Sequence, residues 1–279
     1  RSGAERLQAR VAEVNALNVF PVPDGDTGTN MLATLKAAIA EGDATLATGV
    51  TSIDRVSDAV ARGALLGARG NSGVLLSQIL RGLPQAVRGR KRARAAEIAQ
   101  ALAIGVLHAY GAVATPTEGT ILTVAREVAA SAIAGADTAS ELRPFLLRIA
   151  ESARTSVGKT PTLLAVLREA GVVDSGGTGL QLILEGIADV PSVAASRGAA
   201  EAERRGVGTP SDTPRPSAPP PVAEAPASTE FGYETVFILS SPERPLDLAA
   251  IRAQAASAAS RPSTAASRIA LSLARRRTR

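Results

Sequence analysis

The chain has 279 residues, a net charge of +5 at pH 7 and an apolar content of 45%, but only 2% of its residues are aromatic. It contains no cysteine and one histidine, which excludes disulfides, thiolate metal sites and multi-histidine zinc sites. The length allows one large domain or two ordinary ones. Because the apolar residues are mostly small and aliphatic, we expect closely packed helices.

The positive charge is concentrated at the C-terminus. Residues 260–279 contain six arginines and no acid, and subtracting these six charges from +5 leaves −1 for the rest of the chain. A nucleic-acid-binding fold normally has a basic face and often stacking aromatic residues, so we expect no nucleic-acid partner. No apolar run reaches the roughly 18 residues of a membrane span, and no signal peptide is recognised. A cytoplasmic location is therefore expected.

Residues 1 to about 195 show apolar stripes at helical spacing, separated by short segments of Gly, Thr, Pro and Asn. Thr160 and Pro161 are predicted as the N-cap and first residue of a new helix, since both are common at helix starts. The pattern predicts an all-α domain with eight or nine helices, near residues 7–17, 31–39, 53–65, 74–83, 94–113, 119–135, 141–157, 161–167 and 180–188.

The composition changes after the helical part, which is assigned to residues 1–198. Residues 199–229 are rich in Pro and Ala and are predicted to be a disordered linker. Residues 231–239 then have the composition of a strand, and 246–258 that of a helix. Because one strand and one helix cannot form a stable domain, residues 230–259 are predicted to start a truncated α/β domain. Residues 260–279 form a basic low-complexity tail.

A loop with two carboxylates precedes the second helix: Asn18-Val-Phe-Pro-Val-Pro-Asp24-Gly-Asp26-Thr-Gly-Thr-Asn30. Such a loop suits Mg²⁺, which is usually held by one or two carboxylates together with phosphate oxygens. Asp, Thr and Asn are also common where a turn caps a helix. Taken alone, the loop leaves both interpretations open.

Four polar, glycine-containing segments occur at predicted helix starts, at 24–30, 70–73, 115–120 and 174–179. Helix N-termini bind phosphates well because their backbone N–H groups are unpaired and carry the positive end of the helix dipole. Loops separated by two antiparallel helices return to the same end of an array. We therefore expect several of these segments to converge.

Other nucleotide and metal motifs do not fit the sequence. There is no P-loop, the glycines at 67, 70 and 73 do not form a dinucleotide fingerprint, and Leu35 stands where an EF-hand needs Glu. His108 lies within an apolar helical pattern and is interpreted as structural.

Four motifs together carry a family resemblance that runs over residues 1 to about 195. They are the loop 18–31, Ala68-Arg-Gly-Asn-Ser-Gly-Val74, Thr117-Glu-Gly-Thr-Ile-Leu122 and Val173-Asp-Ser-Gly-Gly-Thr-Gly179. In order and spacing they resemble the DhaL-type nucleotide-binding domain of dihydroxyacetone kinases. They are most similar to the N-terminal domain of bacterial fatty acid kinases. The resemblance implies an eight-helix antiparallel barrel that binds ATP through two Mg²⁺ ions.

The resemblance also assigns roles to individual residues. Asp24 and Asp26 are the implied metal ligands. The dihydroxyacetone kinase pattern has a third aspartate where this chain has Val19, and the neighbouring Asn18 is expected to supply its oxygen but not its charge. The segment from Asp174 to Gly177 is expected to close over the nucleotide. The implied nucleotide-binding residues are Thr27, Asn30, Asn71, Ser72, Gly73, Thr120, Asp174, Gly176 and Gly177.

The function implied by the resemblance is phosphoryl transfer to a fatty acid carboxylate, which a separate fatty-acid-binding partner presents. An ionised carboxylate needs no general base, and the loop offers none. The alternatives are a kinase that phosphorylates dihydroxyacetone and a nucleotide-binding regulatory module without turnover. We expect this chain to bind ATP and Mg²⁺ with weak or incomplete kinase activity, and the oligomeric state is left open, a homodimer included.

Overall fold

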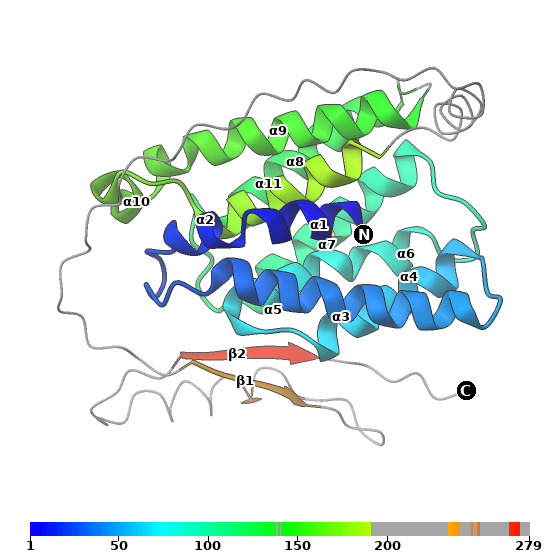
Figure 1. Cartoon of the computed structure of the whole chain (residues 1–279), viewed down its shortest axis with the longest axis horizontal. Helices are drawn as coiled ribbons and strands as arrows, with labels where there is room; N and C mark the ends of the chain where they lie inside the picture. The colour runs from blue at the N-terminus through cyan, green and yellow to red at the C-terminus, as the bar shows by residue number, and fades with distance from the viewer. Residues whose placement is uncertain are drawn as a thin grey trace, which may run out of the picture.

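The computed structural model describes residues 1–137, 139, 141–190, 234–239, 247, 250–251 and 268–273. Residues 1–190 form a helical body in which long helices run roughly alongside one another (Figure 1). Its helices are α1 (Ser2–Ala9), α2 (Val11–Ala16), α3 (Thr27–Ala47), α4 (Ile53–Leu66), α5 (Gly70–Leu80), α6 (Gly82–Ala86), α7 (Ala95–Ala112), α8 (Ile121–Ala136), α9 (Leu142–Leu163), α10 (Ala165–Ala170) and α11 (Ser175–Ala188).

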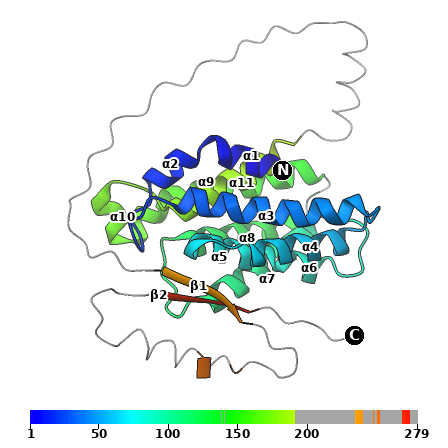
Figure 2. The same ribbon diagram turned by 60° about the horizontal axis from the view of Figure 1, so that its bottom comes forward.

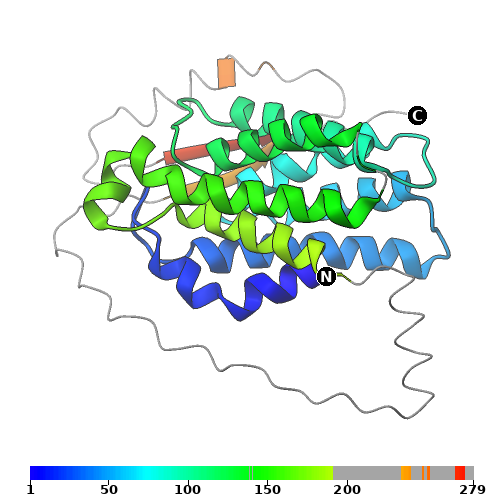
Figure 3. The ribbon, with the colours of Figure 1, turned by 90° about the horizontal axis from the view of Figure 1, so that it is seen from above.

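These helices form a closed ring of eight units. Three neighbouring pairs are separated by single residues: α1 and α2 by Arg10, α5 and α6 by Arg81, and α9 and α10 by Leu164. Counting each pair as one unit, every unit packs against the next, and the ring closes where α11 contacts α1 and α2 contacts α3. Figure 3 shows α9, α11 and α1 side by side along this closure. The predicted all-α, eight-helix barrel is confirmed.

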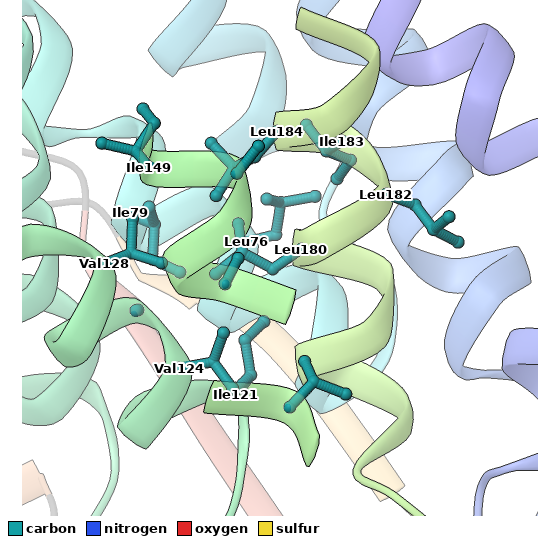
Figure 4. Close-up of a cluster of buried hydrophobic side chains, with 14 of the residues drawn as sticks. Leu76, Ile79, Ile121, Val124, Val128, Ile149, Leu180, Leu182, Ile183 and Leu184 are labelled. Atoms are coloured by element: carbon teal, nitrogen blue, oxygen red, sulfur yellow. The ribbon is translucent and has the colours of Figure 1, made fainter. Parts of the chain in front are cut away.

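Helix α11 is the most enclosed element of the described structure. Twelve of its fourteen residues are buried, and it contacts α1, α2, α3, α8 and α9. In Figure 4, Leu180 lies near Leu76, whereas Leu182 points to the other side of α11. A helix that is apolar nearly all round is expected in the centre of a core. The N-terminal end of α11 therefore lies in a protein environment, whereas Ile187 and the C-cap residue Asp189 at its other end are exposed.

Glycine and alanine allow the helices to approach closely. A Cβ atom on Gly82 would overlap the carbonyl oxygen of Ala101, and one on Gly105 would overlap the carbonyl oxygen of Ile79. The backbones of the α5–α6 unit and α7 thus pack directly against each other. This explains how a core with so few aromatic residues is filled.

The prediction that a new helix begins at Thr160 and Pro161 was wrong, because α9 continues through both residues to Leu163. Proline has no N–H for the carbonyl four residues earlier, which here belongs to Val157. The hydroxyl of Thr160 donates to that oxygen at 2.7 Å and takes the place of the missing donor. The new helix, α10, begins only after Leu164.

Two helices begin earlier than their apolar stripes indicated. Helix α5 starts at Gly70 and α11 at Ser175, so the glycine-rich segments 70–73 and 174–179 form the first turns of these helices. Because glycine is unfavourable inside a helix, the sequence pattern predicted that these two helices begin only after the glycine-rich segments. Close packing around them overrides that preference.

Beyond residue 190 the structure describes two strands, β1 (Glu234–Leu239) and β2 (Arg268–Leu273), which pair in parallel with Glu234 opposite Arg268. Strand β1 confirms the strand expected within 231–239, whereas the sequence predicted no strand within the basic tail. Figure 2 shows the pair beside α5 and α7.

Other predictions for the C-terminal part cannot be compared with the structure. Of the helix expected at 246–258, the structure describes residue 247, which is not helical, and residues 250–251, which are. The predicted linker, 199–229, lies outside the described residues, and the domain assignments remain predictions. Among the described helices, none is long and apolar enough to cross a membrane.

Replacing Thr160 with Val should destabilise the domain by about 2–4 kcal/mol, because it removes a buried hydroxyl that bonds at both ends. This hydroxyl donates to the Val157 carbonyl and accepts from the Asp174 amide at 3.0 Å. Urea denaturation checks the change in the free energy of unfolding. Thr160→Ser keeps the hydroxyl and should lose less than about 1 kcal/mol; equal losses in both variants would contradict this account.

Candidate functional site

The N-termini of α3, α5, α8 and α11 meet at one end of the barrel, as predicted for the four polar segments. Direct contacts join three of them at Thr27, the first residue of α3. Its hydroxyl accepts a hydrogen bond from the Ser175 hydroxyl at 3.2 Å, and its carbonyl oxygen lies 3.5 Å from the Ser72 hydroxyl. The loop that leads into α3 lies at the end of the barrel where α2 and α10 are seen in Figure 1. Four helix dipoles thus present their positive ends to one region.

The start of α5 fits tightly against α3. Gly70 has a φ of +56°, and a Cβ atom there would overlap the side-chain amide nitrogen of Asn30. A Cβ atom on Gly73 would overlap the hydroxyl oxygen of Thr34. These two glycines bring the half-buried Asn71 and Ser72 close to the first turn of α3.

The carboxylates of Asp24 and Asp26 lie next to each other in front of α3. Partial burial raises the pKa of Asp26; a hydrogen bond from Asn30 opposes this, and the negative charge of Asp24 adds to it. Asp24 is exposed and accepts a hydrogen bond from the side-chain nitrogen of Asn18 at 2.6 Å. The metal-ligand role of Asn18 stays a prediction; in this arrangement its amide donates to Asp24.

Two adjacent carboxylates with nearby amide groups suit one Mg²⁺ ion whose remaining ligands are phosphate oxygens and water. The described residues contain no group of three or more His, Cys, Asp or Glu side chains that could hold a metal ion. The two carboxylates suit one ion, and the second Mg²⁺ ion stays a prediction.

The N-terminus of α3 is capped by a side chain from another helix. Asp26 occupies the N-cap position, but its side chain makes no capping hydrogen bond. The oxygen of the Asn15 side chain, on α2, accepts from the backbone N–H of Gly28 at 2.7 Å and of Thr29 at 3.1 Å. The side chain of Asp26 therefore does not cap α3. The sequence analysis missed Asn15, since capping from another helix leaves no local pattern.

Asp174 joins two helix N-termini inside the protein. It is 4% exposed, and its carboxylate accepts from the N–H of Gly177 at 2.6 Å and from the N–H of Ile121, the first residue of α8. Burial raises its pKa to about 7, although both backbone hydrogen bonds oppose this shift. Asp174 is thus bonded within the fold and sets the positions of α8 and α11.

The other predicted residues at this joint are also packed within the protein. The hydroxyl of Thr120 caps α8 by accepting from the Leu122 N–H at 3.3 Å, and it donates to the Thr117 carbonyl at 2.8 Å. A Cβ atom on Gly176 would lie 3.2 Å from the Cβ of Ile121, and one on Gly177 would lie 2.8 Å from a methyl group of Val124. The two glycines allow α8 and α11 to pack closely. Contact of Thr120, Gly176 and Gly177 with a nucleotide stays a prediction.

A polar cluster around Glu118 fixes the loop before α8, and the sequence analysis did not identify it. Glu118 accepts from the hydroxyls of Tyr110 at 3.0 Å and Thr123 at 2.6 Å, and it forms an ion pair with Arg126. Arg126 also donates to the Tyr110 hydroxyl at 2.9 Å. Burial is the largest cause that raises the pKa of Tyr110, to about 12, followed by its hydrogen bond to Glu118.

His108 lies outside the four converging segments. Its side chain is half-buried on α7 and lies 2.6 Å from the side-chain nitrogen of Gln85. Burial, and then the charge of Arg81, lower its pKa. Both features fit a histidine that is neutral and structural.

The stability of the wild-type domain should fall, relative to Asp174→Asn, as the pH rises from about 4 to 7. The folded state raises the Asp174 pKa from 3.8 to about 7. Between these values the unfolded chain loses the proton while the folded chain keeps it, so the stabilisation present below pH 4 is lost by pH 7. Thermal denaturation of both proteins across this range tests the prediction; parallel pH profiles would contradict it.

Comparisons with known proteins give an independent assignment. The profile of the DAK2 domain family matches residues 21–189. Protein YloV of Bacillus subtilis is 45% identical over 185 residues, which cover 66% of this chain and 33% of that protein. An uncharacterized protein of Staphylococcus epidermidis is 44% identical over 184 residues, with the same coverage of 66% and 33%.

Among solved structures, the native form of the dihydroxyacetone kinase of C. freundii aligns with a TM-score of 0.48 and 20% identity, covering 68% of this chain and 33% of that one. The chain spans about a third of the length of the curated relatives it matches. The family profile covers more than half of the chain and all four converging segments. The chain therefore belongs to the DAK2 domain family, the DhaL-type domain indicated by its sequence motifs.

Proposed function

We propose that the barrel binds ATP together with Mg²⁺ and acts as the nucleotide-binding part of a kinase. The observation that carries this proposal is the meeting of four helix N-termini in front of the Asp24 and Asp26 carboxylates. The helix dipoles favour phosphate at such a place, and at the start of α5 the N-cap residue Arg69 makes no side-chain capping bond. The carboxylates supply oxygen ligands for the Mg²⁺ ion that accompanies the phosphates.

Each part of the site has a separate task in this proposal. Asp24 and Asp26 would hold Mg²⁺, which, when bound, neutralises charge on the phosphates. Asn71 and Ser72, in the first turn of α5, would donate hydrogen bonds to phosphate oxygens. Phosphoryl transfer depends mainly on positioning and on charge stabilisation. Helix ends that are held in place by hydrogen bonds would provide both.

A fatty acid carboxylate is the acceptor that this site fits best. Asp24 and Asp26 are assigned to the cation, and the buried Asp174 is bonded to two backbone N–H groups. None of these three carboxylates is therefore suited to remove a proton from a hydroxyl group. A carboxylate acceptor is already ionised at neutral pH and needs no such base. We infer that a separate acyl-binding protein presents it, since the acyl chain itself is insoluble in water.

Dihydroxyacetone as acceptor would require a base from another protein, and a regulatory module would bind ATP without turnover. Turnover assays separate these possibilities. The full chain, supplied with Mg²⁺ and ATP, is mixed either with an acyl-loaded binding protein or with dihydroxyacetone. Acyl phosphate formation supports the proposal. Phosphorylation of dihydroxyacetone alone, or binding without any product, would overturn the proposed acceptor.

Asp24→Ala and Asp26→Ala should each weaken Mg²⁺-dependent ATP binding by at least about tenfold, which corresponds to about 1.4 kcal/mol. Each change removes half of the carboxylate pair. Isothermal titration calorimetry with and without Mg²⁺ measures the effect, and circular dichroism shows whether the helices are retained. Unchanged affinity in both folded variants would rule out the site.

Gly70→Ala should also weaken ATP binding, because its methyl group would displace the Asn30 side chain. Gly89→Ala is the matched control, since Gly89 also has a positive φ, +70°, but nothing lies within 4 Å of an added Cβ atom. Both variants should lose similar backbone stability, of about 1–2 kcal/mol. We expect only Gly70→Ala to lower the ATP affinity, measured at a temperature where both variants are folded. An equal affinity in the two variants would show that α5 does not take part.

A further inference from the structure

We infer that Asn15 is a positioning residue that caps α3 in place of Asp26 and so keeps the Asp26 carboxylate beside Asp24. The inference deepens the proposed function and rests on it, since it assigns the carboxylate pair to a cation. It also makes a claim about the ligand-free fold that can be tested separately. Asn15 lies on α2, eleven residues before Asp26.

The hydrogen bonds of Asn15 are those that an N-cap side chain normally makes. In a capped helix, the side chain at the N-cap accepts from the N–H groups of the second or third helical residue. For α3 these residues are Gly28 and Thr29. The Asn15 oxygen accepts from both, at 2.7 and 3.1 Å. Its nitrogen donates to the Thr29 hydroxyl at 3.0 Å, which fixes the orientation of the amide group.

Gly28 lets α2 come close enough for this cap. A Cβ atom at residue 28 would lie 2.8 Å from the Val11 carbonyl oxygen and 3.0 Å from the Asn15 side-chain oxygen. Any larger residue would push α2 away from the start of α3. The pairing of Asn15 with Gly28 is thus a second observation that α2 and the first turn of α3 are fitted to each other.

The arrangement determines where the Asp26 carboxylate lies. Aspartate is among the preferred N-cap residues, so Asp26 would ordinarily turn toward its own helix. Here its carboxylate instead accepts a hydrogen bond from Asn30 and lies next to Asp24. Because Asn15 occupies the two backbone donors, turning back toward α3 offers Asp26 no hydrogen bond. Without Asn15, capping and cation binding would compete for the same carboxylate.

A double-mutant cycle on the ligand-free chain tests the cap. The variants are Asn15→Ala, Asp26→Ala and the double mutant, and the readout is the melting temperature. Asp26→Ala alone should cost no stability, because Asp26 does not cap α3. In the Asn15→Ala background, where Asp26 is free to cap, the same change should lower the melting temperature by about 2–4 °C. Equal effects of Asp26→Ala in both backgrounds would overturn the inference.

Binding of Mn²⁺, used as a spectroscopic probe for Mg²⁺, tests the consequence for the site. Asn15→Ala should weaken Mn²⁺ binding in the presence of ATP by about tenfold, because Asp26 turns away to cap α3. Asn15→Asp retains an oxygen acceptor for both N–H groups and should bind Mn²⁺ within about threefold of the wild type. Equal weakening in Asn15→Asp and Asn15→Ala, or wild-type affinity in Asn15→Ala, would contradict the positioning role.

Glu97→Ala is the control for a general loss of capping. Glu97 accepts from the Arg94 N–H at 2.8 Å at the start of α7, and α7 is 18 residues long, so this cap lies about 27 Å from the end of α7 that leads into segment 115–120. Its loss should lower the melting temperature without changing Mn²⁺ affinity. If the wild type itself binds no Mn²⁺ with ATP, the proposed function fails, while the ligand-free cycle still decides the role of Asn15. An additive cycle in a protein that does bind Mn²⁺ with ATP refutes the capping inference alone.

Discussion

The buried N-terminus of α11 is the constraint on which the rest of the barrel depends. This helix is enclosed by its neighbours, so water cannot pair its first N–H groups, and an unpaired buried N–H is costly. Asp174 accepts from Gly177 and at the same time from the start of α8, while its own N–H donates to Thr160 on α9. One residue, through its carboxylate and its backbone N–H, thus aligns three helices. The ends aligned in this way form one wall of the proposed phosphate-binding region.

The residues that the sequence marked as functional fall into two physical groups. Asp24, Asn71 and Ser72 are exposed or half-buried and can reach a ligand. Thr120 and Asp174 are buried and make their hydrogen bonds within the protein. The second group acts on the site by setting where the helix ends lie. Polar residues of the motifs, such as Thr120 and Asp174, therefore determine the geometry of the helix ends, whatever contacts they make with a ligand.

The barrel and its four segments could be predicted because helical spacing and glycine at helix starts are local signals. The continuation of α9 through Pro161 could not, since it depends on one hydroxyl bond from Thr160 to Val157. The capping of α3 by Asn15 was also hidden, because the pattern of residues around Asp26 looks like an ordinary cap. In both cases a side-chain hydrogen bond replaces the backbone or capping bond that the sequence pattern implies, within α9 for Thr160 and from another helix for Asn15.

Closure of the ring joins the first and last helices of the domain. Arg6 on α1 donates a hydrogen bond at 3.0 Å to the buried Glu185 on α11, which lies 179 residues later in the sequence. The hydroxyl of Ser175 donates to that of Thr27, 148 residues earlier. Contacts of such long range form late in folding, because the intervening chain must first be ordered. During synthesis, α3 leaves the ribosome well before α11. A nascent chain would hold both aspartates of the loop yet lack the start of α11, and with it the complete wall of the proposed phosphate-binding region, until the whole barrel had emerged.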